Sequence, residues 1–248
     1  MSHKVLRTLV CCALVASYLA MPPAALAVGG GLGFVFDESL IPNAKVNAVP
    51  ADSLDFTYHA CLHFFAADKF RESGYFWISS FQDVDSVVDS QINYIESSGY
   101  HIYGKYTYKA QQWGMAQPTP NGVRLNYVAA PLQTSITLFL DPDQDTVLSI
   151  QNCQVVAQGT ADDVPLGSSN AIFEGEKSET NDIANGDFEL IFGDNWLFTA
   201  QGEELFGHPA NFNFLVFNGN VTQLGGALGM DHSPEGSGNL FWVAQPHD

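Results

Sequence analysis

Hydrophobic and polar residues alternate along much of the chain, which is the pattern of strands with one buried face. In "DFTYHACLHFF" one face holds Phe56, Tyr58, Ala60, Leu62 and Phe64, and the other holds Thr57, His59, Cys61 and His63. The same period of two recurs in "GVRLNYV", "SITLFL" and "NFNFLVF". The sequence therefore predicts several half-buried strands.

Signals for tight turns separate these strands. Asn-Gly pairs occur at 121–122, 185–186 and 218–219, and both residue types tolerate the positive φ angles that hairpin turns need. Many short strands with such turns are typical of packed antiparallel sheets. We therefore predict an all-β fold, an antiparallel β-sandwich of jelly-roll-like type.

One stretch, "DVDSVVDSQINYIESSG", departs from this alternation. Its apolar residues fall at helical spacing: Val84, Val87, Val88, Ile92 and Ile95. Acidic residues crowd its start, where they suit the helix dipole, and a glycine at its end can terminate a helix. The pattern predicts one amphipathic helix from Asp85 to Ser97, packed on a sheet.

The first 27 residues have the organisation of an export signal. Lys4 and Arg7 give a basic start, an apolar stretch follows, and Ala25-Leu26-Ala27 fits a cleavage site. We expect residues 1–27 to be removed and residues 28–248 to form a single β-sandwich domain. The product is expected to be secreted to the cell exterior, with the periplasm as the alternative. No later apolar run reaches about 18 residues, so no membrane span is expected after cleavage.

The charge balance narrows the function. The chain has 9 basic and 27 acidic residues, a formal charge of −18. Removing Lys4 and Arg7 leaves 7 basic residues against 27 acidic ones, a charge of −20. Such a chain lacks the basic footprint that nucleic acid requires, so nucleic-acid partners are excluded. The negative charge suits solubility or cation binding.

Cys61 and Cys153 are the two cysteines that follow the export signal. Two thiols in an exported protein most often pair, so the sequence predicts a disulfide that closes a loop of roughly 90 residues. Two alternatives stay open. Both cysteines could be free and buried, or Cys61 could join His59 and His63 as a zinc or copper ligand on one strand face.

"FLDPDQDT" places Asp141, Asp143 and Asp145 at alternate positions, as at the start of a calcium loop. An EF-hand loop would need Gly at its sixth position and Glu at its twelfth, where this chain has Thr146 and Asn152. We therefore expect an exposed turn between two antiparallel strands. It would hold calcium weakly at most, and no other cofactor is expected.

Motif searches indicate no enzyme class. The chain has no nucleophile elbow, zinc-protease motif, phosphate loop or dinucleotide-binding fingerprint. A glycosidase needs only two carboxylates beside a sugar, but nothing selects a pair among so many acidic residues. The tryptophans are candidate platforms for sugar rings, although strand tryptophans are more often core residues: Trp77, Trp113, Trp196 and Trp242. The sequence favours a non-catalytic protein.

Several segments, in order, resemble bacterial flocculation-associated PEP-CTERM proteins over most of residues 33–220. They are "GFVFDESLIPNA", "FAADKF", "YHIYGKYTYKA", "ITLFLDPDQDT" and "GDFELIFGDNWLFTAQGEELFGHPANFNFLVFNGN". The resemblance implies an exported protein that helps to hold cells within exopolysaccharide flocs, and it carries over no catalytic residues. The last residues, "NLFWVAQPHD", lack the sorting tail of that family, so its sorting and anchoring are not implied.

Three functions follow as hypotheses. The first is an exported, non-catalytic cell-surface or biofilm-matrix protein that contacts polysaccharide. The second is a secreted glycan-active enzyme on a β-sandwich, and the third is a calcium-binding exported module. An aromatic row in a groove without a carboxylate pair would favour the first, whereas two carboxylates about 5–10 Å apart in such a groove would favour the second.

Overall fold

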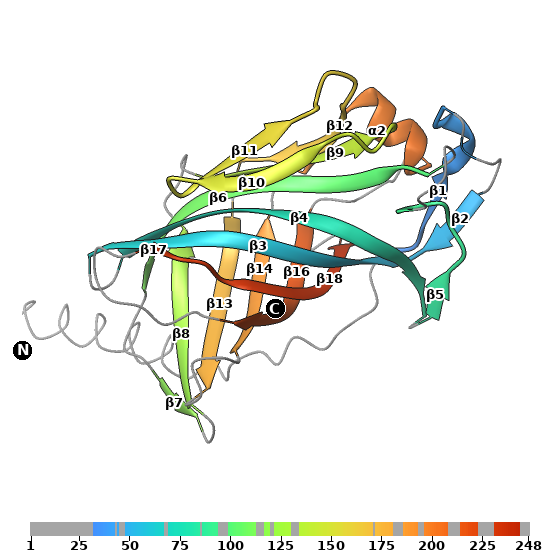
Figure 1. The fold of residues 1–248 in the computed structure, drawn as a ribbon. Coiled ribbons are helices and arrows are strands. Elements are labelled where there is room, and N and C mark those ends of the chain that lie inside the picture. Colours follow the sequence, from blue (N-terminus) through green and yellow to red (C-terminus); the bar gives the residue numbers. More distant parts are fainter. Residues whose placement is uncertain are drawn as a thin grey trace, which may run out of the picture. The chain divides into compact units, whose positions relative to one another are not determined.

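Antiparallel strands make up nearly all of the regular structure in the computed structural model (Figure 1). The structure describes residues 32–42, 44, 48–66, 69–84, 86–93, 99–112, 117–119, 122–129, 134–170, 172–180, 186–192, 196–207, 214–222 and 231–243. All of them belong to one unit, Gly30–Pro246. The predicted export signal, residues 1–27, lies outside the described residues, as do Asn121 and Asn185 of two predicted turns.

The elements are as follows in chain order. They are β1 (Phe34–Asp37), a 3-10 helix η1 (Glu38–Leu40), β2 (Ala48–Ala51), β3 (Ser53–Ala66), β4 (Lys69–Asp83), β5 (Ser86–Val88), β6 (His101–Gln112), β7 (Gln117–Thr119), β8 (Gly122–Ala129), β9 (Ser135–Asp141), β10 (Val147–Gln151), β11 (Gln154–Gln158), β12 (Val164–Ser169), β13 (Ile172–Thr180), β14 (Gly186–Phe192), β15 (Leu197–Phe198), α2 (Ala200–Leu205), β16 (Phe214–Thr222), β17 (Asp231–His232) and β18 (Glu235–Val243).

Fourteen of the described strands form one antiparallel sheet. Its main path runs β15-β12-β9-β6-β4-β3-β18-β16-β14-β13-β8-β7, with β5 beside β4 and β17 beside β3. The last residues of β6 also pair with β8, so the sheet curls until strands far apart in this order meet again. The predicted all-β antiparallel fold is confirmed.

The long strands β3 and β4 show how the alternation sets the two faces of the sheet. Phe56, Tyr58, Ala60 and Leu62 of β3 are buried, as the pattern predicts, while His59 is exposed. β4 alternates in the same way, with Phe70, Glu72, Gly74, Phe76 and Ile78 buried. The intervening residues of both strands therefore face outward, and so do alternate residues of the neighbouring β6 and β9.

The core is rich in aromatic side chains near β1 and α2. Trp242 is fully buried, with its ring centroid 5.7 Å from that of Phe34 and 5.2 Å from that of Phe206. Trp196 is also buried, 6.1 Å from Trp242. Two of the four tryptophans considered as sugar platforms are therefore core residues, and Trp113 lies outside the described residues.

The helix predicted from Asp85 to Ser97 is wrong for the described part of that stretch. Residues 86–88 form β5, which pairs with β4 as an edge strand, and residues 94–98 lie outside the described residues. Val84 and Val87 are 77% and 71% exposed, so their helical spacing marks no buried face. β-branched residues favour strands over helices, and here that local preference prevailed.

The one α-helix among the described residues is the short α2. Thr199 caps it, because its hydroxyl accepts a hydrogen bond from the amide of Gly202 at 3.0 Å. Six residues are too few for the periodic apolar pattern on which a helix prediction rests.

The turn predicted at Asn218-Gly219 is also wrong. Both residues lie inside β16, where Asn218 pairs with Asn239 and Gly219 pairs with Gly238 of β18. A Cβ added at Gly219 would lie 2.4 Å from the carbonyl oxygen of Ser237. The glycine therefore permits a close approach of two strands rather than a reversal of the chain.

Candidate functional site

A separate hairpin, β10–β11, lies beside β6 and β9 (Figure 1). Asn152 and Cys153 form its two-residue turn, with φ angles of +51° and +58°. Positive φ at both central residues is the geometry of a type I′ turn, which is unusual for a cysteine. Cys153 therefore lies at the tip of a hairpin and not within a strand.

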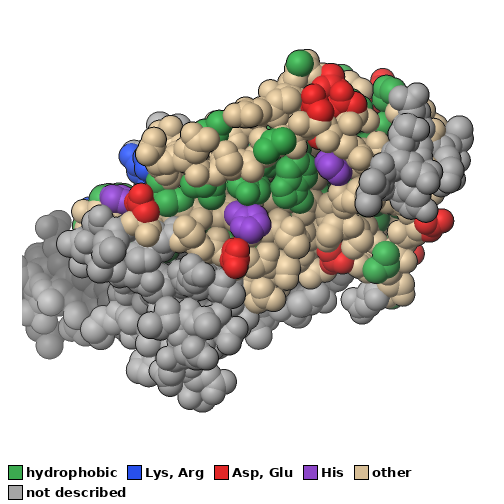
Figure 2. All heavy atoms as spheres, in the orientation of Figure 1, with side chains coloured by type: hydrophobic (Ala, Val, Ile, Leu, Met, Phe, Trp, Pro, Cys, Tyr) green, Lys and Arg blue, Asp and Glu red, His purple; other side chains and the backbone are tan. Residues whose placement is uncertain are grey.

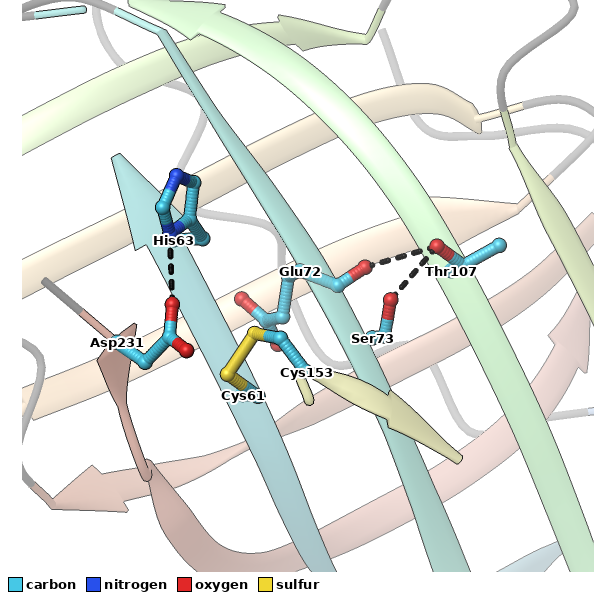
Figure 3. Close-up of a disulfide and its surroundings, with 7 residues drawn as sticks. All are labelled: Cys61, His63, Glu72, Ser73, Thr107, Cys153 and Asp231. Carbon is cyan, nitrogen blue, oxygen red and sulfur yellow. Dashed lines mark hydrogen bonds and ion pairs between the residues drawn. A yellow bond between two sulfur atoms is a disulfide. The ribbon is translucent and has the colours of Figure 1, made fainter. Parts of the chain in front are cut away.

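The tip of the hairpin is tied to β3 by a disulfide (Figure 3). Cys61 and Cys153 have Cα atoms 5.1 Å apart, within the usual range for a disulfide of about 4.4–6.8 Å. This geometry fits the pairing predicted from the sequence. The bridge spans 92 residues and fixes the hairpin against the outward face of the sheet.

The disulfide removes the thiolate that the His-Cys-His metal alternative needs. The two histidines instead face carboxylates on neighbouring strands. His63 Nδ1 lies 2.6 Å from Asp231 Oδ1, and His59 Nδ1 lies 3.4 Å from Glu235 Oε2. Both pairs are partly or largely exposed, so they contribute little to stability.

A groove of about 520 Å³ lies between the hairpin and the outward face of β4, β6 and β9. The sheet contributes Arg71, Lys105, Thr107, Thr137 and Phe139, and the hairpin contributes Gln154 and Val155. None of the described residues that line it carries a carboxyl group. The groove thus combines cationic, hydroxyl, amide and aromatic side chains without an acid–base pair.

Positive charge is concentrated on this face. Arg71 and Lys109 are paired neighbours on β4 and β6, and Lys69 and Lys105 lie on the same two strands with the same outward parity. These four are a majority of the 7 basic residues that follow residue 27. Within the described residues, no carboxylate forms an ion pair with any of the four.

The two cations inside the groove differ in their surroundings. The Nε atom of Arg71 is buried and has no hydrogen-bond partner in the described structure. Lys105 Nζ lies 4.6 Å from the centre of the Phe139 ring, a cation–π arrangement. A buried donor without a partner is costly, so the Nε of Arg71 is a polar group that the described structure leaves unsatisfied.

Aromatic rings continue from the groove across β6 to β4. The Phe139 and Tyr103 rings are stacked with centroids 5.1 Å apart, and Trp77 lies 5.3 Å from Tyr103. Tyr103 is fully buried and donates a hydrogen bond to Asp163. Burial raises the pKa of Tyr103, and the hydrogen bond and charge of Asp163 raise it further. Figure 2 shows hydrophobic side chains gathered in a band across this face, with histidines beside them.

The Asp141–Asp145 loop leads from β9 to the hairpin. Asp143 and Asp145 are exposed as predicted, but Asp141 is fully buried, which corrects that prediction. Its carboxylate accepts hydrogen bonds from the amides of Gln144 at 2.8 Å and Thr146 at 3.2 Å. The loop also does not join two paired strands, because β9 belongs to the large sheet and β10 pairs with β11.

These three aspartates could offer one oxygen each to a cation, because such atoms lie within 4.8 Å of one another. Burial raises the pKa of Asp141, although the amides of Thr146 and Gln144 lower it and the Asp163 carboxylate raises it. Partial desolvation raises the pKa of Asp145, together with the charges of Asp143 and other nearby carboxylates. Both carboxylate oxygens of Asp141 accept backbone hydrogen bonds, so this side chain stabilises the conformation of the loop.

The sequence reasoning missed the groove itself. Arg71, Lys105 and Phe139 are in no catalytic or ligand-binding motif, and the alternation around Phe139 predicts only a strand. One signal in the sequence does indicate a cationic surface. The basic residues of β4 and β6 all occupy the alternate positions that face away from the buried side chains. That signal becomes meaningful only when β4 and β6 are known to be neighbours in register.

Comparisons with known proteins assign no family to this chain. No protein-family model, no curated protein and no solved structure matches it. The resemblance to flocculation-associated PEP-CTERM proteins therefore stays a prediction. Among the described residues, no helix is long and apolar enough to cross a membrane.

Proposed function

We propose that this protein is an exported, non-catalytic component of a cell-surface or biofilm matrix that binds acidic polysaccharide in the groove beneath the β10–β11 hairpin. The observation that carries the proposal is the placement of Arg71 and Lys105 in the lining of one groove of a strongly acidic chain, with the Phe139 ring beside Lys105. Acidic polysaccharide here means a polymer that contains carboxylated sugars such as uronates.

The side chains that line the groove suit successive sugar residues of such a polymer. The guanidinium of Arg71 can meet a carboxylate with two parallel hydrogen bonds, and Lys105 supplies a second positive charge. The Phe139 ring offers an apolar surface to the carbon-bound hydrogens of a sugar ring. Thr107 and Thr137 add hydroxyl groups that can bond ring substituents.

The charge of the whole protein does not prevent this binding. The net charge repels a polyanion at long range, but salt screens exposed charges beyond about 8 Å at physiological ionic strength. At contact, the local cluster on β4 and β6 dominates. The acidic remainder of the surface then disfavours nonspecific binding to nucleic acid or other strong polyanions.

The absence of carboxyl groups from the described groove lining supports a binding role over glycan cleavage at this site. The resemblance to flocculation-associated proteins supports the same role, since matrix polysaccharide is what such proteins are expected to meet. The calcium-binding hypothesis has the Asp143 and Asp145 side chains in its favour, which are exposed beside Asp141. Calcium there would add a weak bridge to polyanions.

The test is binding of alginate and polygalacturonate by wild type and by an Arg71→Gln/Lys105→Gln variant, followed by calorimetry. We expect the variant to lose about tenfold or more in affinity, since two charge-assisted contacts disappear. The matched control is Lys69→Gln/Lys109→Gln, which removes the same charge from the same strands outside the groove lining. We expect it to lose less than about threefold.

Equal losses in both double variants would mean that diffuse charge, and not the groove, binds the polymer. Release of new reducing ends from either polymer by the purified protein would replace the binding proposal with the enzyme hypothesis.

A further inference from the structure

A second hollow, of about 400 Å³, lies on the same outward face at the β3, β16 and β18 strands. Seven polar side chains surround it: Asp55, Thr57, Ser79, Asn218, Asn220, Ser237 and Asn239. No basic or imidazole side chain lines it among the described residues. It is therefore chemically unlike the cationic groove.

Strand register builds this hollow. Asn218 pairs with Asn239 and Asn220 pairs with Ser237, with the glycine pair Gly219–Gly238 between them. A Cβ added at Gly238 would lie 2.0 Å from the carbonyl oxygen of Asn218, so this position accepts only glycine. Both glycines have the parity of the buried Phe217 and Leu240, so they permit a close approach of the two strands and place no side chain on the outward face.

Existing hydrogen bonds hold part of the rim in place. Asp55 Oδ1 accepts a bond from Asn239 Nδ2 at 2.8 Å, and Asp55 Oδ2 accepts one from Ser80 Oγ at 2.7 Å. Asn220 Oδ1 accepts a bond from the amide of Ser237 at 3.2 Å. Both carboxylate oxygens of Asp55 therefore accept hydrogen bonds, and one of these bonds fixes the orientation of the Asn239 side chain. The Nδ2 of Asn220 and the Oδ1 of Asn239 keep hydrogen-bonding capacity for a ligand.

Trp77 lies one strand beyond Thr57 of the hollow's lining in the register of the sheet. Ser237 pairs with Thr57, and Thr57 pairs directly with Trp77 on β4. Trp77 is partly exposed, and its edge-to-face neighbour His101 lies 5.2 Å away between ring centroids. Three strand spacings of about 4.8 Å separate Asn220 from Trp77, roughly the length of three adjacent sugar units.

We infer that this hollow is a second carbohydrate site, which binds neutral sugar residues with Trp77 as a stacking platform and the Asn218, Asn220 and Asn239 amides as hydroxyl partners. Side-chain amides present a donor and an acceptor together, which suits vicinal hydroxyl groups. The absence of cations disfavours a carboxylated sugar. The biological ligand of this site rests on the proposed function, but the site itself is tested separately.

The experiment is NMR titration with neutral oligosaccharides of about five units, cello-oligosaccharide and isomalto-oligosaccharide, to about 10 mM. We expect saturable shifts and a weak dissociation constant for at least one of them. Asn218→Ala/Asn220→Ala should weaken this binding roughly fivefold or more, because two hydrogen-bonding partners are lost. Trp77→Leu should weaken it by a similar factor through loss of stacking.

The control is Arg71→Gln/Lys105→Gln, which should bind the neutral oligosaccharides as wild type does. The two sites can then fail independently. If Arg71→Gln/Lys105→Gln loses binding to the acidic polymer but still binds the neutral oligosaccharides, the loss is a property of the groove and leaves the second site supported. No saturable shift with either neutral oligosaccharide, or unchanged affinity in the Asn218→Ala/Asn220→Ala variant, would overturn the second site.

Discussion

Glu72 lies on the core face of β4, where its carboxyl oxygens accept hydrogen bonds from two tyrosines. Tyr106 donates to Oε1 at 2.8 Å and Tyr108 donates to Oε2 at 2.9 Å, and Glu72 is 1% exposed. We predict that Glu72→Ala lowers the free energy of unfolding by about 3 kcal/mol, because two buried hydroxyls lose their acceptor. Tyr108→Phe should lower it by about 1 kcal/mol. Urea unfolding measures both, and a wild-type midpoint for Glu72→Ala would refute this role.

Asp141 gives a pH-dependent prediction. Its pKa in the folded protein is raised above the ordinary value of about 3.9, chiefly by burial, so the folded state holds this proton more tightly than the unfolded state does. Its contribution to stability therefore falls as the pH rises above about 4. Asp141→Asn does not titrate, so its stability relative to wild type should increase from pH 4 to pH 7, measured by urea unfolding. A stability of wild type that rises relative to the variant over this interval would contradict the raised pKa.

Asp141 also shows where residue-level reading stops. Asp141 continues the outward-facing positions of β9, and this alternation alone predicts an exposed side chain. The chain then turns back over it, so that the Gln144 and Thr146 amides cover both carboxylate oxygens. A sequence pattern cannot show that an outward residue is covered by the loop that it starts.

At the scale of elements, the β10–β11 hairpin depends on its disulfide. We predict that Cys61→Ser/Cys153→Ser lowers the free energy of unfolding by about 2–4 kcal/mol. The same variant should weaken acidic-polysaccharide binding roughly tenfold, because a released hairpin no longer holds Gln154 and Val155 over the groove. Chemical denaturation and calorimetry measure the two effects.

A turn variant provides the control for this element. Asn152→Gly keeps the positive φ that the turn requires, so it should preserve both stability and binding. Unchanged polysaccharide affinity in the double serine variant would mean that the groove does not need the hairpin.

The strands were largely predictable and the helix was not. Alternation in β3 and β9 predicts their buried faces because a half-buried sheet has a side-chain period of two. The helix prediction at Val84 and Val87 is wrong because both side chains are exposed, and burial does not constrain the spacing of apolar residues in an exposed edge hairpin. The turn prediction at Asn218-Gly219 is wrong because glycine is favoured both in tight turns and where two strands approach closely. Local patterns report conformational preference, whereas strand order and register decide the outcome.

At the scale of the whole molecule, buried tyrosines predict loss of stability in alkali. Burial is the largest cause of the raised pKa values of Tyr58, Tyr100, Tyr103 and Tyr106. The unfolded state releases these protons near pH 10 while the folded state keeps them, so stability falls as the pH rises above about 10. Tyrosinate absorbance should rise together with unfolding. A smooth titration of all tyrosines near pH 10 in folded protein would contradict this.

The candidate site belongs to the whole molecule and could not be derived from any single segment. Its cations come from β4 and β6, its aromatic ring from β9 and its cover from a hairpin fixed to β3. The sequence predicts an acidic exported protein that contacts polysaccharide, which stays a prediction, and it does not predict where such a ligand would bind. Long-range pairing brings these residues together, and composition does not encode that pairing.

The most direct test compares one acidic polysaccharide with its carboxyl-reduced form, which keeps the same linkages and loses the charge. We predict that wild type binds the acidic form about tenfold or more tightly and that this preference disappears in Arg71→Gln/Lys105→Gln. Equal affinity of wild type for the two forms would contradict the account, because the groove would then not recognise the carboxylate.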